Sequence, residues 1–154
     1  MQHQHAIKAD YFLYGIQAGI ISFQDAIYWA DKIIEVEDVP CVEIIDLALS
    51  KSRGRNEVMN ALKGIPGKRD PQLSGSYLLG DLKQLLFAGG DLKDIAHKAM
   101  NVAAITQQPD DDYFRFIAID DGIALAEAGV YNTLAQCRED LRQVLSQYKA
   151  WNEV

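Results

Sequence analysis

Residues 22–34 decide the fold, and they read Ser-Phe-Gln-Asp-Ala-Ile-Tyr-Trp-Ala-Asp-Lys-Ile-Ile. Apolar side chains recur in this stretch at spacings of three and four, which is the period of an amphipathic α-helix. These apolar positions are Phe23, Ala26, Ile27, Ala30, Ile33 and Ile34. Ser22 followed three residues later by Asp25 resembles a capping box, so we expect the helix to begin there.

The helical period continues after this segment. Pro40 can occupy the first turn of the next helix, where its missing N–H costs nothing. The apolar stripe of that helix is expected to be Cys41, Ile44, Ile45, Ala48 and Leu49. A shorter helix around residues 57–63 should end at Gly64, because two prolines and two glycines make residues 64–71 a loop.

The second half repeats this organisation. A stripe at Leu78, Leu82, Leu85 and Leu86 is followed by Asp91, which should cap a helix over residues 92–103. The last stripe is the clearest, with Leu134, Cys137, Leu141, Val144, Leu145, Tyr148 and Trp151 on one face. Residues 113–119 would also suit a short strand, but a lone strand has no partner, so a helix is favoured. We predict an all-α fold, a single domain spanning residues 1–154 and built as an irregular or orthogonal bundle of about seven to eight helices.

Composition limits the class of protein. The 154 residues are 49% hydrophobic and 24% charged, values typical of a folded chain that buries its own core. The first residues lack the apolar core of a signal peptide, and no segment approaches about 18 uninterrupted apolar residues. We therefore expect a cytoplasmic protein that does not associate with membranes. The net charge of −7 should repel nucleic acid and attract cationic partners.

Residues 51–69 are the exception to this acidity. They contain six bases and a single acid, Glu57. The bases are Lys51, Arg53, Arg55, Lys63, Lys68 and Arg69. Because they coincide with a short helix and a Pro/Gly loop, we expect an exposed feature. An adaptor could use it to meet an acidic partner or RNA, although the acidic remainder of the chain opposes polyanions.

No catalytic or metal-binding signature stands out. We expect His3 and His5 to lie in a frayed N-terminus, and His97 stands on a helix without a second ligand at metal spacing. Nucleotide and nucleophile fingerprints do not occur. The sequence therefore predicts no cofactor, no metal site and no enzyme activity.

Two groups of aspartates leave alternatives open. Asp120 and Asp121 interrupt an apolar segment, where they could form an ion pair, cap a helix break near Gly122, or serve as an acid or base in a pocket. The pocket alternative would make the chain a small-molecule-binding or enzymatic helical domain. Asp110, Asp111 and Asp112 should begin a helix, where negative charge meets the positive end of the dipole.

A third group of acids is denser. Glu35, Glu37, Asp38, Glu43 and Asp46 straddle the end of one helix and the start of the next without a base among them. They form either a solvated acidic corner or a patch that docks a cationic surface. Trp29 lies beside them in sequence, either as an interface anchor or packed inward.

Three segments carry a family resemblance. They are Tyr11-Phe-Leu-Tyr-Gly-Ile16, Gly19-Ile-Ile-Ser22 and Ile27-Tyr-Trp-Ala-Asp-Lys-Ile-Ile34, followed by the acids and Pro40. Over about residues 10–65 the chain resembles small all-helical immunity proteins of bacterial polymorphic-toxin and contact-dependent growth inhibition systems. The resemblance implies a cytoplasmic protein that is not an enzyme. It also implies that the protein binds and blocks the C-terminal toxin domain of a sister or neighbouring cell, often a nuclease.

The charge and the resemblance lead to the same predicted partner. A nuclease presents Lys and Arg to phosphates, so an acidic inhibitor can cover that surface by imitating nucleic acid. We predict that Glu35, Glu37, Asp38, Glu43 and Asp46 contact a basic toxin domain first, and Asp110, Asp111 and Asp112 second. Trp29 is the predicted aromatic anchor.

Overall fold

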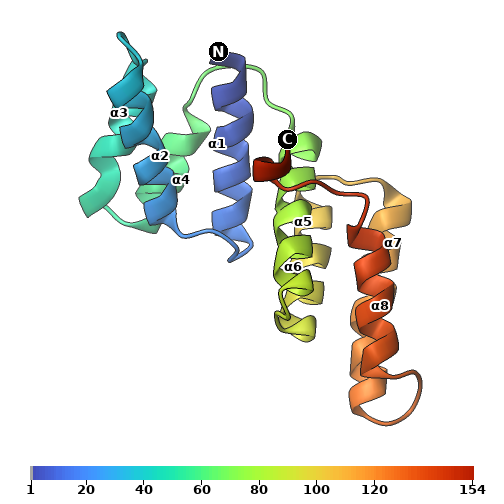
Figure 1. Ribbon diagram of the computed structural model, residues 1–154. Coiled ribbons are helices and arrows are strands. Elements are labelled where there is room, and N and C mark those ends of the chain that lie inside the picture. Colours follow the sequence, from blue (N-terminus) through green and yellow to red (C-terminus); the bar gives the residue numbers. More distant parts are fainter. Residues whose placement is uncertain (1) are drawn as a thin grey trace. The chain divides into compact units, whose positions relative to one another are not determined.

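The computed structural model describes residues 2–154, with side chains from His5 onward. These residues form eight α-helices and two short 3-10 helices (Figure 1). The described residues contain no strand, so the predicted all-α fold is confirmed. None of their helices is both long enough and apolar enough to span a membrane. The chain divides into two compact units, Met1–Ser74 and Gly75–Val154, with the boundary inside one helix. The single domain expected from the sequence stays a prediction.

The first unit contains four α-helices. They are α1 (Gln2–Gln17), α2 (Phe23–Val36), α3 (Val42–Leu49) and α4 (Arg55–Lys63), with a 3-10 helix at Ser50–Ser52. Helix α2 packs against all three others, and α1 also packs against α4. Helix α2 begins where the sequence predicts, and the Ser22 hydroxyl accepts a hydrogen bond from the backbone amide of Gln24 at 3.3 Å.

Two expectations about where helices begin in this unit are wrong. The N-terminus is not frayed around His5, because α1 already begins at Gln2. The His5 imidazole lies 2.7 Å from the Glu37 carboxylate, while the side chain of His3 lies outside the described part. Pro40 precedes α3 by two residues instead of opening it, since the backbone enters the helix through an extended Cys41.

The second unit begins inside α5. Its elements are α5 (Pro71–Phe87), α6 (Leu92–Ile105), α7 (Asp110–Glu127), α8 (Leu134–Leu145) and a 3-10 helix at Trp151–Glu153. Helix α7 packs against both α6 and α8. Asp91 caps α6 as predicted, accepting a hydrogen bond from the Asp94 amide at 2.9 Å. Residues 113–119 are helical as predicted, and α7 continues through Gly122, so the break considered there does not occur.

Two glycines in α5 allow other parts of the second unit to approach this helix closely, a side chain at Gly75 and the backbone at Gly80. A Cβ atom on Gly75 would lie 2.0 Å from Thr106 Oγ1, and one on Gly80 would lie 2.1 Å from the Ala150 nitrogen. The C-terminal residues therefore lie directly on α5. Lys83 fixes them by donating to the Tyr148 carbonyl at 2.6 Å and pairing with a Glu153 carboxylate oxygen at 3.0 Å.

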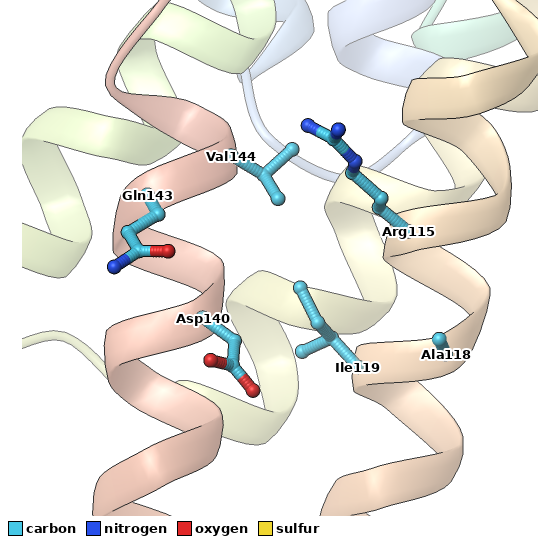
Figure 2. A pocket seen from close by; sticks show the side chains of 6 residues that line it. All are labelled: Arg115, Ala118, Ile119, Asp140, Gln143 and Val144. Carbon is cyan, nitrogen blue, oxygen red and sulfur yellow. The ribbon is translucent and has the colours of Figure 1, made fainter.

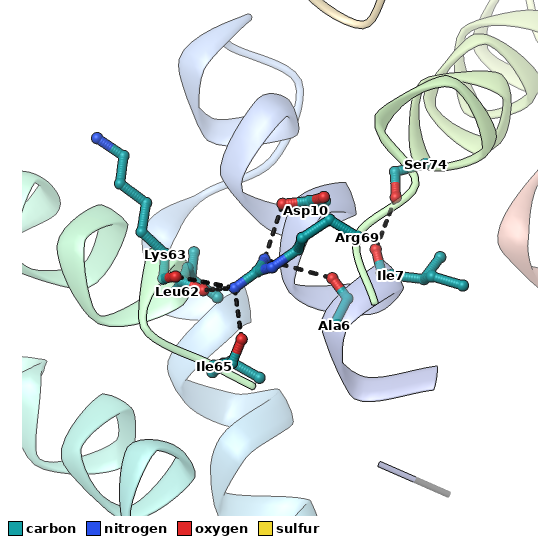
Figure 3. Close-up of polar contacts among 8 residues, drawn as sticks. All are labelled: Ala6, Ile7, Asp10, Leu62, Lys63, Ile65, Arg69 and Ser74. Carbon is teal, nitrogen blue, oxygen red and sulfur yellow. Dashed lines mark hydrogen bonds and ion pairs between the residues drawn. The ribbon is translucent and has the colours of Figure 1, made fainter. Parts of the chain in front are cut away.

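Arg69 is the largest departure from the exposed basic stretch that we expected. Its guanidinium pairs with Asp10 at 2.8 Å and also donates to the carbonyls of Leu62, Lys63 and Ile65 at the end of α4 (Figure 3). Carbonyls at and just beyond the C-terminal end of a helix are not fully paired by the i+4 amides, so a cation is well placed to bind them. Arg69 thus holds the 64–70 loop against α1 and α4, while Lys51, Arg53, Lys63 and Lys68 are exposed.

Candidate protein-binding surface

Acidic and apolar side chains lie together on the last turn of α2, the following loop and α3. We call this set the α2–α3 surface. It comprises Glu35, Val36, Glu37, Asp38, Val39, Val42, Glu43, Ile45, Asp46 and Leu49. The apolar members are conspicuously open to water, with Val39 exposed by 89%, Val36 by 78% and Leu49 by 65%. Clustered exposed apolar groups with a polar rim are typical of protein-binding sites.

The composition of α3 explains why this surface exists. Six of its eight residues are apolar, more than one buried stripe requires. Ile44 and Leu47 are fully buried, whereas Val42, Ile45 and Leu49 recur at spacings of three and four on the exposed side. The predicted stripe had placed Ile45 and Leu49 inside and is wrong on both. The sequence of α3 contains two apolar faces, and packing against α2 and α4 buries the one with Leu47.

The five predicted acids differ in how their charge is used within the chain. Glu37 pairs with His5, and exposed Glu35 lies 3.5 Å from Lys32. Asp38 and Asp46 are exposed, and Glu43 is half-buried. None of these three acids forms an ion pair with another described residue. The α2–α3 surface therefore keeps a negative charge that a cationic partner can neutralise.

Trp29, the aromatic anchor expected beside the acids, packs inward, whereas its neighbour Tyr28 is exposed. Trp29 is half-buried, and its ring centroid lies 5.3 Å from that of Phe12 and 5.9 Å from that of His5. It packs toward α1. Tyr28 is 62% exposed and lines a cavity of about 310 Å³ that Asp31 also lines. Tyr28, Asp31 and Glu35 share one face of α2 by their spacing, so the exposed aromatic continuing the α2–α3 surface is Tyr28.

The second predicted group, Asp110, Asp111 and Asp112, forms the first turn of α7 in the other unit, as expected for a helix start. Asp112 accepts hydrogen bonds from the Tyr148 hydroxyl at 2.8 Å and the Gln147 amide at 3.1 Å. Burial, together with the bond to Asp112, raises the pKa of Tyr148. Asp112 therefore secures the C-terminal segment, and only Asp110 and Asp111 are exposed.

Asp120 and Asp121 lie on the middle turns of α7. Asp120 is half-buried and 3.9 Å from His97 Nδ1, and Asp121 is exposed. Neither lines the cavity of about 380 Å³ between α7 and α8. That cavity is lined by Arg115, Ala118, Ile119, Asp140, Gln143 and Val144 (Figure 2). The helical spacing places it beside a different face of α7 from the two aspartates.

The described part of the chain contains no group of three or more His, Cys, Asp or Glu side chains placed to hold a metal ion. Comparison with protein-family models, with curated proteins and with solved structures gives no match to the chain.

Sequence reasoning identified the acids of the α2–α3 surface but missed its apolar members. Val36, Val39 and Val42 interrupt the run of acids, and this alternation was the available signal. A purely solvated acidic corner has no need of five apolar side chains in water. The signal was obscured because Ile45 and Leu49 fit a buried stripe equally well.

Proposed function

We propose that this chain is an immunity protein that binds and neutralises a cognate bacterial toxin domain through the α2–α3 surface. The observation that carries the proposal is the mixture of unneutralised carboxylates and exposed apolar side chains on that surface. Carboxylates steer a cationic partner into place, and apolar contacts then supply affinity by leaving water. Such a site suits a folded basic protein better than a small ion.

The proposed partner is a basic nuclease domain. A nuclease has to present Lys and Arg to the phosphates of its substrate, so its active face is cationic before substrate arrives. Asp38, Glu43 and Asp46 can meet those cations in place of phosphate. The inhibitor would then act in the cytoplasm, by occlusion and without chemistry of its own, which accords with the family resemblance of residues 10–65.

The test is co-expression with the C-terminal toxin domain encoded beside the gene. Growth rescue together with co-purification of the two proteins is the expected result. If the chain neither restores growth nor co-purifies with that domain, the immunity proposal is wrong.

Charge reversal then tests the surface itself. Asp46→Lys places a cation among the exposed residues of α3, and we expect it to slow association with the toxin domain by about tenfold at low salt. The difference should shrink as salt screens the charges. Stopped-flow association rates at two salt concentrations would measure it.

The matched control is Asp121→Lys, which makes the same change of charge at an exposed position of α7. It should alter the rate only through net charge. Equal effects of Asp46→Lys and Asp121→Lys would remove the α2–α3 surface as the docking site. A larger effect of Asp110→Lys would move the site to the start of α7.

A further inference from the structure

The cavity between α7 and α8 has walls of opposite charge. Arg115 extends from α7 and Asp140 from α8, and their charged ends lie toward opposite ends of the cavity, with Ile119 and Val144 between them (Figure 2). Its volume of about 380 Å³ falls in the range of small-molecule sites. Ile119 and Val144 are each 7% exposed, so the base of the cavity is apolar and part of the protein core.

The charged groups of this cavity are available to a ligand. Arg115 is exposed and makes no hydrogen bond or ion pair within the described residues. Asp140 is half-buried; within the described residues it accepts one hydrogen bond, from the Gln136 amide at 2.9 Å, and forms no ion pair. Although they line the same space, Arg115 and Asp140 do not reach each other as an ion pair. Each therefore retains most of its capacity for a charge-assisted hydrogen bond.

The pairing of charges selects the class of ligand. A simple anion would be attracted by Arg115 and repelled by Asp140, and a simple cation would meet the reverse. A molecule that carries a carboxylate and an ammonium group satisfies both walls at once, and its apolar part can lie on Ile119 and Val144. Gln143 adds an amide at the rim that can donate or accept.

We infer that the α7–α8 cavity binds a small zwitterion with an apolar side chain, either a free amino acid or a short peptide. The carboxylate lies against Arg115, and the ammonium group lies against Asp140. This inference is independent of toxin binding, because the cavity and the α2–α3 surface lie in different units of the chain.

An NMR titration of the full, isotope-labelled chain tests the inference. The probes are L-leucine, the dipeptide Ala-Leu, N-acetyl-leucine and leucinamide, of which the last two each lack one charge. We expect leucine or Ala-Leu to give saturable shifts confined to α7 and α8, and the better of these two distinguishes an amino acid from a peptide ligand. The blocked probes should bind at least about tenfold more weakly, since each loses a charge-assisted contact.

Two substitutions test whether Arg115 binds the carboxylate of the ligand and Asp140 binds its ammonium group. Arg115→Gln should lose the preference for leucine over leucinamide, and Asp140→Asn should lose the preference for leucine over N-acetyl-leucine. Arg53→Gln, an exposed change in the first unit, should keep both preferences. The same spectra report whether each variant is folded. Absence of binding by leucine and Ala-Leu up to about 10 mM, above the range of weak specific affinity, would overturn the inference, as would equal binding of the blocked probes.

Discussion

The Asp10–Arg69 pair combines a nearly buried carboxylate with a guanidinium that has several other acceptors. Asp10 is 4% exposed, and its Oδ2 atom has no hydrogen-bond partner among the described residues, while Oδ1 binds Arg69. Burial raises the pKa of Asp10 above its ordinary value of 3.8, even though Arg69 acts in the opposite direction. The ionised form of Asp10 is therefore less stable in the folded protein than in water. Arg69 still stabilises the fold through its hydrogen bonds to backbone carbonyls.

This raised pKa predicts a pH dependence of stability. Between 3.8 and the raised value, the folded protein holds the Asp10 proton more often than the unfolded chain does. The contribution of this group to the free energy of unfolding is therefore fully present below that window and is lost as pH rises through it. Urea unfolding between about pH 4 and pH 7 should show wild type losing stability relative to Asp10→Asn as pH rises. The opposite slope would mean that attraction to Arg69 outweighs burial.

Gly80 and Gly122 offer a second residue-scale prediction. A Cβ atom on Gly80 would collide with the backbone of Ala150, so Gly80→Ala should cost about 1–3 kcal/mol by overpacking. On Gly122 the same atom would lie 3.6 Å from Cys137 Sγ, an ordinary contact, and Gly122→Ala should stabilise α7 by about 1 kcal/mol. Denaturant unfolding of the two variants measures both. Destabilisation by both substitutions would contradict the space found at Gly122.

At the scale of single residues, the sequence could not identify long-range partners. Asp10 and Arg69 are 59 positions apart, and His5 and Glu37 are 32 apart. Arg69 looked like one more member of an exposed basic stretch because its carbonyl acceptors depend on where α4 ends. Local spacing predicted caps such as Asp91 well, since both partners lie within one turn.

Among the helices, amphipathic ones were predictable and the others were not. In α6, which the sequence predicts over residues 92–103, six residues at helical spacing are buried: Leu92, Ile95, Ala96, Ala99, Val102 and Ala103. Helix α1 was missed because its buried positions include three successive residues, Tyr11 to Leu13, in a pattern without a clear helical face. Helix α3 was recognised, but its two apolar faces made the orientation undecidable from spacing alone.

Helix α3 therefore supplies an element-scale prediction. Leu47 is fully buried, and Leu47→Ala should cost about 3 kcal/mol through lost burial and a residual cavity. Leu49 is 65% exposed, and Leu49→Ala should change stability by less than about 0.5 kcal/mol. Chemical unfolding of both variants provides the measurement. Similar losses for the two leucines would show that Leu49 packs inside the protein.

Across the whole molecule, one tryptophan lies in each compact unit. Trp29 is in the first unit, and Trp151 lies in the second, where its ring centroid is 4.6 Å from that of Tyr77. Trp151→Phe leaves Trp29 as the sole tryptophan, and Trp29→Phe leaves Trp151. Each variant thus reports on the unfolding of one unit.

The predicted single domain requires these reporters to agree. Because the boundary falls inside α5, unfolding of one unit would also disrupt a helix that continues into the other. We expect each variant to show the same unfolding midpoint by its tryptophan fluorescence and by far-ultraviolet circular dichroism. Fluorescence that departs from circular dichroism would indicate two independently folding domains.

The five apolar side chains of the α2–α3 surface also affect how the free protein behaves in concentrated solution. At neutral pH the net charge of −7 makes copies of the chain repel one another. The sequence isoelectric point is about 4.8, where this colloidal repulsion vanishes while Val36, Val39 and Val42 stay exposed. Mild acidification should therefore promote reversible clustering of folded molecules, so purification and storage are best kept well above that pH.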